Sequence, residues 1–310
     1  MVLDGHADLL YDVVRRAAAG ERDILTRRHL PRLQTGSVEG LVLAIWAAPE
    51  AEETYAENTA RMLAAAQAEF AASPWLRVVR TAAEAEQAKA MGKIYAFLSI
   101  EGMAAIGADF AGIDRYARLG ARFCTLTWNE ENLLATGAGG DPQARLTMLG
   151  RQAVCRMQKL GMMVDVSHLN DRGFWDVIGL AERPVLASHS NCRALCDVPR
   201  NLTDEQMRAI RDTGGVVGVN SFHRFAHADP QQQTVEMLAR HACHMAEVMG
   251  VEHVICGFDF CGYFGPGNES VKGLEDCSQS ANFFQWLERF GMTAQERELV
   301  ARGNLLRLLR

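Results

Sequence analysis

Eight short runs of apolar, largely β-branched residues recur along the chain, and segments with helical periodicity separate most of them. The runs are residues 2–8, 40–47, 93–101, 122–128, 162–168, 184–189, 215–220 and 253–259, and the clearest helical segments are 55–72, 82–91, 146–160, 203–213 and 234–249. Strands that alternate with helices predict βαβ units and a parallel sheet. Eight such units are what a closed (β/α)8 TIM barrel requires, so we expect residues 1–310 to form this α/β barrel as a single domain.

Local motifs support this choice of architecture. An open, doubly wound sheet typically carries a G-x-G-x-x-G loop after its first strand, whereas the first run here ends in His6-Ala7-Asp8. The tetrapeptide Thr203-Asp204-Glu205-Gln206 has the pattern of a capping box, and Gly214 stands where a left-handed residue ends the same helix.

The charge and hydropathy patterns exclude several functional classes. Net charge is −6 and the densest basic run is only Arg27-Arg28-His29, which predicts no nucleic-acid partner. The longest wholly apolar run, 41–48, is far shorter than the ~20 residues of a membrane span, and the first residues do not resemble a signal peptide. Eight cysteines without a C-x-x-C pair predict free thiols in a reducing compartment, so we expect a cytoplasmic protein with no membrane partner.

Polar side chains stand at the carboxyl ends of most of the apolar runs. They are His6, Asp8, Glu101, His168, His189, Asn220 and Asp259. In a (β/α)8 barrel these ends converge on one mouth, where active sites are built. We therefore expect the seven residues to share one site.

Several of these residues have the chemistry of metal ligands. His6 and Asp8 are two residues apart, so on a strand both point to the same side. Imidazole and carboxylate together suit zinc, and also manganese, cobalt or iron. His168 and His189 add a second pair of nitrogen ligands, and Glu101 has two oxygens that could bridge two ions.

Structural alternatives exist for single residues. A lone strand-end histidine can be a hydrogen-bonded core residue, and Glu101 could cap the following helix; their repetition at one mouth favours the metal site. His241 and His244 lie one helical turn apart, and we expect this pair on a solvated helix face rather than at a metal.

At this point the chain resembles the renal or membrane dipeptidases, binuclear-zinc members of the amidohydrolase superfamily with a (β/α)8 barrel. The resemblance covers nearly the whole chain and depends on the order and spacing of its motifs. These are Gly5-His6-Ala7-Asp8, Ser99-Ile100-Glu101-Gly102, Leu126-Thr127, Val164-Asp165-Val166-Ser167-His168, Ser188-His189-Ser190, Pro199-Arg200-Asn201-Leu202, Gly257-Phe258-Asp259-Phe260 and Gly303-Asn304-Leu305-Leu306-Arg307.

The resemblance implies a role for each residue that matches a family motif. His6 and Asp8 match the ligands of one zinc ion, and His168 and His189 match those of the other. Glu101 matches the bridging carboxylate, Asp259 the catalytic acid/base, and Arg200 the arginine that contacts the substrate's carboxylate.

Two positions depart from the family pattern. Trp128 occupies the place of the histidine that polarises the scissile carbonyl, and Cys261 replaces an aspartate in Asp259-Phe260-Cys261-Gly262. Indole N–H can donate a hydrogen bond but cannot become charged. We expect Trp128 and Asn220 to contact the substrate, and ordinary L,L-dipeptides to be hydrolysed weakly or not at all.

The expected function is metal-dependent hydrolysis of the amide bond of a dipeptide or N-acyl amino acid, with two divalent ions, most simply Zn²⁺, activating a shared water. A small-molecule substrate is the expected partner, and the resemblance suggests a homodimer. Two alternatives stay open: the same cage acting on a non-peptide amide or lactone, and a catalytically silent barrel that binds a metal or ligand.

Overall fold

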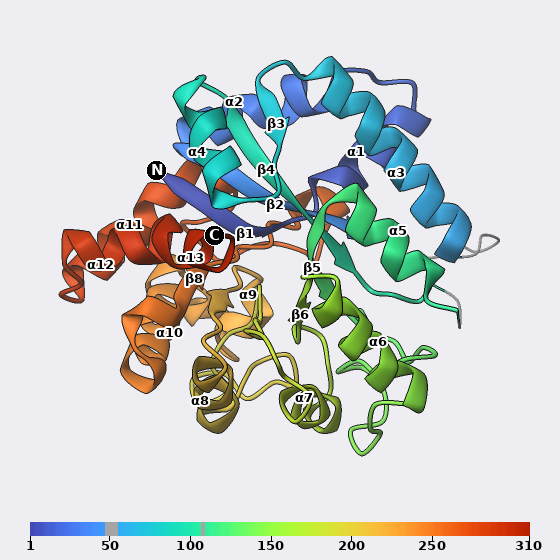
Figure 1. Cartoon of the computed structure of the whole chain (residues 1–310). Helices are drawn as coiled ribbons and strands as arrows, with labels where there is room; N and C mark the ends of the chain where they lie inside the picture. Colours follow the sequence, from blue (N-terminus) through green and yellow to red (C-terminus); the bar gives the residue numbers. More distant parts are fainter. Residues whose placement is uncertain (47–54, 107–108) are drawn as a thin grey trace.

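The computed structural model describes residues 1–46, 55–106 and 109–310, and its centre is a curled parallel sheet (Figure 1). Strands β1, β2, β4, β5 and β6 are hydrogen-bonded in that order, β3 pairs with the start of β4, and β7 pairs with β8. Their bounds are β1 Val2–Ala7, β2 Val38–Trp46, β3 Leu76–Val78, β4 Ile94–Glu101, β5 Ala121–Thr125, β6 Met163–Asp165, β7 Val217–Val219 and β8 Val254–Cys256. Every pairing is parallel, as the alternating pattern predicts.

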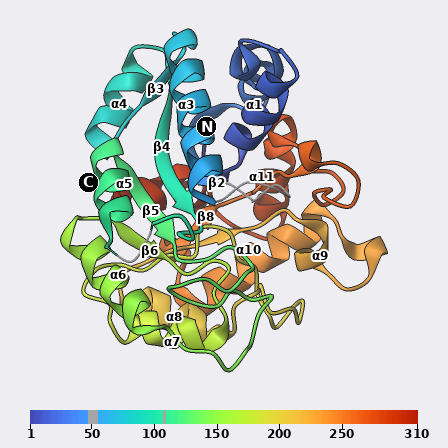
Figure 2. The same ribbon diagram turned by 90° about the vertical axis from the view of Figure 1, so that its right-hand side faces the viewer.

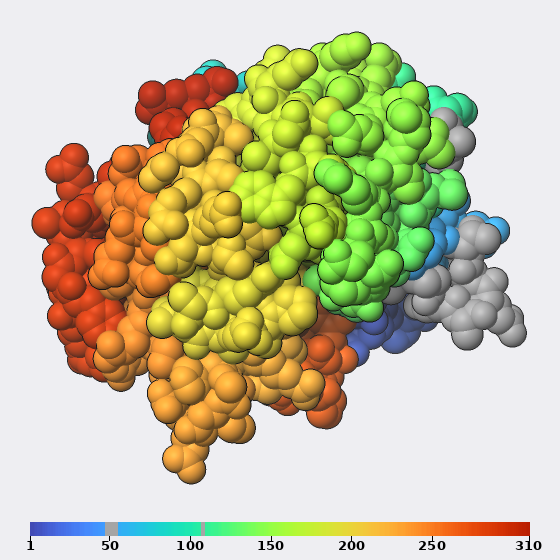
Figure 3. All heavy atoms as spheres, turned by 90° about the horizontal axis from the view of Figure 1, so that it is seen from below, coloured from blue at the N-terminus to red at the C-terminus, as the bar shows by residue number. Residues whose placement is uncertain are grey.

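Helices surround the sheet in both ribbon views (Figures 1 and 2). The α-helices are α1 Leu9–Ala18, α2 Leu30–Thr35, α3 Tyr55–Ala72, α4 Ala82–Ala90, α5 Ala111–Leu119, α6 Met148–Lys159, α7 Asp171–Ile178, α8 Asp204–Asp212, α9 His223–Ala226, α10 Val235–Met249, α11 Ser280–Arg289, α12 Ala294–Glu298 and α13 Asn304–Leu308. Short π or 3-10 turns are η1 Leu25–His29, η2 Pro230–Gln232, η3 Val251–His253, η4 Gly262–Phe264, η5 Cys277–Gln279 and η6 Leu299–Gly303. Seen from below, green, yellow and orange segments form one continuous surface, so the middle and later parts of the chain cover this side (Figure 3).

The ring closes through contacts between segments that are distant in the sequence. Single parallel bridges from Asp165 to Leu186 and from Ala187 to Val217 connect β6 to β7 through residues 186–187. On the other side, β8 lies against β1, and the Asp259 N–H donates to the His6 carbonyl (3.3 Å). Eight positions therefore surround the axis, and the predicted barrel is confirmed; that residues 1–310 are one domain stays a prediction.

The barrel is filled, so the mouth rests on a packed floor. One cluster of buried side chains draws from strands all round the ring; it includes Leu3, Val42, Phe97, Phe123, Met163, Leu186, Val216 and Ile255. Leu305 and Leu309, from α13 and the residue after it, belong to the same cluster, which brings both ends of the chain together (Figure 1). Such a filled interior is general for these barrels and leaves one end of the strands for chemistry.

Several strands are shorter than the apolar runs predict. The predicted strand 162–168 ends at Asp165, 253–259 ends at Cys256, and 184–189 contributes only the two bridge residues. The physical reason is that buried carboxylates accept the backbone N–H groups that a longer ladder would use. Asp165 Oδ1 accepts from Ser167 N (3.0 Å) and Ser188 N (3.1 Å).

The helix predictions agree with the structure to within two residues at each end, and β3 is a strand that the pattern did not predict. The capping box of α8 is present, with Thr203 Oγ1 accepting from Gln206 N, and Gly214 has φ +82°. The last residue of the predicted strand 40–47 lies outside the described residues. No helix in the described part of the chain is long and apolar enough to cross a membrane.

Candidate metal centre and substrate pocket

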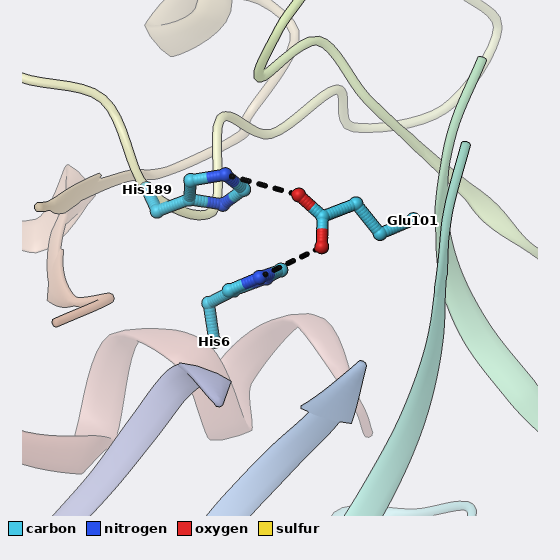
Figure 4. A group of neighbouring side chains, drawn as sticks. All are labelled: His6, Glu101 and His189. Carbon is cyan, nitrogen blue, oxygen red and sulfur yellow. Dashed lines mark ion pairs between the residues drawn. The ribbon is translucent and has the colours of Figure 1, made fainter. Parts of the chain in front are cut away.

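Glu101, the last residue of β4, lies between two groups of histidines at the mouth of the barrel. Its Oε2 is 3.3 Å from His6 Nε2, while its Oε1 is 2.9 Å from His168 Nε2 and 3.7 Å from His189 Nε2. Figure 4 shows His6 and His189 approaching different oxygens of this carboxylate. One carboxylate thus faces His6 with one oxygen and His168 and His189 with the other, and ligand atoms of His6, Glu101 and His189 all lie within 4.8 Å of one another.

Two carboxylates complete the group around His6. His6 Nε2 is 3.6 Å from Asp8 Oδ1 and 4.0 Å from Asp259 Oδ1. His6 and Asp8 therefore do lie close together at the mouth, as expected. The alternation of side chains along a strand does not fully explain this, because Asp8 is not part of the strand. β1 ends at Ala7, and Asp8 is the N-cap of α1, where its side chain makes no capping hydrogen bond and turns to the mouth.

The donor set fits divalent metal ions. His6 Nε2, Asp8 Oδ1 and Glu101 Oε2 are buried atoms without a hydrogen-bond partner in the described part of the protein. The Nε2 atoms of His168 and His189 are 2.8 Å apart, a distance at which two imidazoles compete for one proton. Unsatisfied buried polar atoms are costly, and imidazole nitrogens with carboxylate oxygens are the ligands that zinc prefers.

Hydrogen bonds on the far side of the imidazoles orient this set. His168 Nδ1 is 2.9 Å from Asn129 Oδ1, and His189 Nδ1 is 2.7 Å from Ser188 Oγ. Such partners hold the Nε2 atom of each ring towards the centre and fix its tautomer. His168 also has φ +73°, a left-handed conformation that a histidine adopts at a cost and that here turns the ring inward.

The electrostatics differ between the two sides of Glu101. Burial raises the pKa of Glu101, and the Asp8 carboxylate adds to that rise. Burial acts to lower the pKa of His6, but the Glu101 and Asp8 carboxylates overcome it and raise that pKa. Burial lowers the pKa of both His168 and His189, which keeps these imidazoles neutral and able to bind a metal.

Asp259 lies at the edge of the cluster, three residues after β8, with φ +54°. Asn220 Nδ2 donates to its Oδ2 (3.0 Å), and the Cys261 thiol donates to its Oδ1 (3.2 Å). Burial raises the pKa of Asp259. Asn220 itself is fully buried, so this geometry favours a positioning role for it, and its predicted contact with substrate stays untested.

A cavity of about 260 Å³ opens beside these residues. Asp8, Glu101, His168 and Asp259 line its inner side; Arg200 and Trp128 line it as well, and the other lining residues are Trp46, Asn129, Phe222, Phe225, Cys261, Phe264 and Asn268. Trp128 is 39% exposed and its ring centre is 6.0 Å from that of His168. Two of the three predicted substrate contacts, Arg200 and Trp128, therefore border the cavity, whereas Asn220 does not line it.

Sequence reasoning missed the residues beneath the site. Asp4 Oδ1 accepts from His6 N (3.3 Å) and Phe258 N (2.9 Å). On the opposite side of the barrel, Asp165 Oδ1 likewise accepts from two backbone N–H groups. Burial raises the pKa of Asp4 to about 7. The sequence did contain a signal for Asp4, since a carboxylate inside an apolar strand must find buried hydrogen-bond donors.

The predicted surface position of His241 is wrong: it is fully buried, accepts from Cys192 N, and lies 2.8 Å from the Ala226 carbonyl.

Comparisons with known proteins show the family of this chain. The family model described as membrane dipeptidase, peptidase family M19, matches residues 1–310. An uncharacterized protein in the pqqA 5' region of Klebsiella pneumoniae is 36% identical over 209 residues, which cover 64% of this chain and 77% of the relative. The uncharacterized dipeptidase C965.12 of Schizosaccharomyces pombe is 34% identical over 223 residues, which cover 70% of this chain but only 53%, about half, of that relative.

A solved structure has the same fold over its full length. The metallo peptidase from Rhodobacter sphaeroides, crystallised with a phosphinate mimic of the dipeptide L-Ala-D-Ala, superimposes with a TM-score of 0.89 at 27% identity, covering 99% of this chain and 98% of the other. The resemblance inferred from the motifs is therefore confirmed. The chain belongs to the membrane dipeptidase family, peptidase family M19, whose metal-dependent enzymes hydrolyse the amide bond of dipeptides.

Proposed function

We propose that this protein hydrolyses dipeptides, or closely related N-acyl amino acids, that carry a free carboxylate. The proposal rests on one observation, that the Arg200 guanidinium is buried beside the cavity without an ion-pair partner among the described residues. Its side chain is 9% exposed, borders the cavity, and has no ion-pair partner in the described part of the chain. Its closest polar contact is weak, from Nη2 to the His189 carbonyl at 3.5 Å, and Phe225 lies against the guanidinium.

A buried guanidinium of this kind is suited to a substrate anion. Burial lowers the pKa of Arg200 to about 10, so it keeps its charge at neutral pH. A planar guanidinium can bind a carboxylate through two parallel hydrogen bonds. We assign this carboxylate to the carboxyl-terminal residue of the substrate, because it fixes the scissile amide at the neighbouring ligand cluster.

Two zinc ions are the metals that we propose for the cluster. His6 and Asp8 would hold one, His168 and His189 the other, and Glu101 would bridge them. Bound there, the ions would act as Lewis acids that polarise the scissile carbonyl and make water more acidic near neutral pH.

The chain's own groups would move the proton. Asp259, with its raised pKa, would accept a proton from the attacking water at one carboxylate oxygen and deliver it to the leaving amine. The Asn220 amide donates to Oδ2 and holds this carboxylate beside Asp8 and His6. The same residue can thus serve as base and then as acid without moving.

The cellular setting belongs to the same proposal. All eight cysteines are free thiols, and Cys124, Cys192, Cys196 and Cys256 are buried. Free thiols persist in reducing compartments, which supports the cytoplasm. A homodimer stays a prediction that sedimentation would test.

The test is turnover of a dipeptide panel by protein that has been treated with chelator and then supplied with Zn²⁺. We expect hydrolysis only with metal, and none by the Glu101→Gln variant. The matched control is Glu39→Gln, which removes a buried carboxylate near the other end of the barrel, where Glu39 Oε1 accepts from Tyr95. Zinc-dependent hydrolysis of lactones without any hydrolysis of dipeptides would contradict the proposal.

A further inference from the structure

Three aromatic side chains form one side of the cavity, and we call Trp46, Trp128 and Phe264 the aromatic wall. The ring centres of Trp46 and Trp128 are 5.3 Å apart, and those of Trp46 and Phe264 are 5.5 Å apart. The three residues come from the end of β2, the segment after β5 and the segment after β8. The wall therefore exists only in the folded barrel.

The wall is held in place from behind. Tyr11, on α1, stacks on Phe264 with ring centres 4.3 Å apart and an angle of 20°, and it also packs against Trp46 at 5.3 Å. Aromatic pairs at such distances attract each other beyond their simple burial. Glu130, two residues after Trp128, accepts from the backbone N–H of Trp128 and from Asn132 Nδ2, and it does not line the cavity. The surface offered to a ligand is therefore preorganised and apolar.

The middle of the wall, Trp46, lies across the mouth from Arg200, while Trp128 and Phe264 follow strands two positions from β2 on either side. Going round the ring, the order is β1, β2, β4, β5, β6, residues 186–187, β7 and β8. Trp46 ends the second of these eight positions, and Arg200 donates to the carbonyl of His189, just after the sixth. Because the barrel has eight strand positions, a separation of four places Trp46 and Arg200 on opposite sides of the mouth, with Glu101 and the histidines between them.

This arrangement sets the direction of a bound substrate. If Arg200 holds the carboxylate and the ligand cluster holds the scissile amide, the amino-terminal residue must extend towards the opposite side. We propose that the aromatic wall binds the side chain of this amino-terminal residue and selects a large apolar, preferably aromatic, one. The inference rests on the proposed dipeptide hydrolysis and adds its substrate class.

The test compares kcat/KM for L-Phe-L-Ala, L-Ala-L-Ala and L-Lys-L-Ala with zinc-loaded protein. Wild type should prefer Phe-Ala over Ala-Ala by at least roughly 10- to 100-fold, because an apolar pocket provides about this much discrimination for a single methylene group. Phe264→Ala and Trp128→Ala should each reduce this ratio several-fold, mostly through KM for Phe-Ala. Ala-Ala serves as the internal reference for any general loss of activity.

Trp175→Ala is the matched control. Trp175 lies on α7, is 37% exposed against 39% for Trp128, and does not line the cavity. This variant should keep the wild-type ratio. Equal rates on Phe-Ala and Ala-Ala, or a preference for Lys-Ala, would overturn the wall's role while leaving dipeptide hydrolysis established. Absence of hydrolysis of all three with zinc bound, while other members of the dipeptide panel are hydrolysed, would overturn the wall's role alone; absence of hydrolysis across the whole panel would overturn both proposals.

Discussion

Replacing Arg200 by methionine removes the guanidinium but keeps most of the side chain's length. If Arg200 binds the substrate's carboxylate in its buried position, the variant leaves that carboxylate without a partner. Losing one member of a buried, hydrogen-bonded charge pair costs about 2–5 kcal/mol. With a factor of ten for each ~1.4 kcal/mol, kcat/KM should fall about 30- to 4000-fold.

The stability of Arg200→Met should not fall. Arg200 forms no ion pair in the described part of the protein, and the attraction of the Asp259, Glu101 and Asp165 carboxylates is smaller than the effect of burial, which lowers its pKa. Taking a single cation out of a buried position removes a desolvation cost. We therefore expect a melting temperature equal to or above that of the wild type, which separates loss of binding from loss of fold.

The decisive assay is a four-way comparison of two enzymes and two substrates. Wild type should prefer a dipeptide over the corresponding dipeptide amide, which has no carboxylate, by the same 30- to 4000-fold. Arg200→Met should show almost no preference. Arg122→Met, at a half-buried arginine of β5 that does not line the cavity, should behave as wild type. A variant that still discriminates against the amide would refute the assignment of Arg200.

The remaining predictions concern the metal ions, the proton carrier, the indole and acid stability. Elemental analysis after zinc loading should show about one ion fewer in His6→Ala and in His168→Ala; wild-type protein without any zinc would contradict the metal site. Asp259→Asn should keep its metal while kcat falls roughly 10²–10⁴-fold, and unchanged turnover would assign the proton transfer to another group. Trp128→His should raise kcat/KM for Ala-Ala by ~10²-fold, because an imidazole adds an oxyanion donor, and should raise kcat/KM for Phe-Ala several-fold less, because the aromatic wall is shortened; unchanged turnover of Ala-Ala would contradict this. Burial lowers the pKa of His241 to about 4, against about 6.5 in an unfolded chain, so the fold holds it neutral. The unfolding free energy should therefore decrease as pH falls from about 6.5 to about 4, by roughly 3 kcal/mol from this group, and denaturant titrations of His241→Gln should lack that part of the decrease.

Much of the site could be predicted from the order of residues in the sequence, because of the common direction of the strands in a parallel barrel. All strands end at the same mouth, so a histidine or carboxylate that closes an apolar run reaches the site whatever its neighbours are. Glu101 is the clearest case, since β4 ends at that residue. His6 follows the same rule on β1. Helix ends were readable for a comparable reason, because the capping of α8 involves only residues within one turn.

Features that depend on contacts between distant segments could not be predicted from the sequence pattern. His241 lies on the buried face of α10, beside Leu238 and Met245. Its hydrogen-bond partners there, Cys192 and Ala226, come from segments outside the helix. The strand lengths depend on Asp4 and Asp165, whose carboxylates take backbone N–H groups from neighbouring segments. Such partners cannot be assigned from local pattern, since each carboxylate has many possible donors along the chain.

The sequence by itself therefore determined the barrel, the mouth that carries the chemistry, and the residue types able to hold a metal, because each follows from periodicity and from the common direction of parallel strands. Only the tertiary structure decided how those residues face one another. The left-handed turn at His168, the unpaired state of Arg200 and the meeting of Trp46 with Phe264 are of this kind. The last of these joins segments more than two hundred residues apart in the sequence, and close packing has no period that a sequence could display.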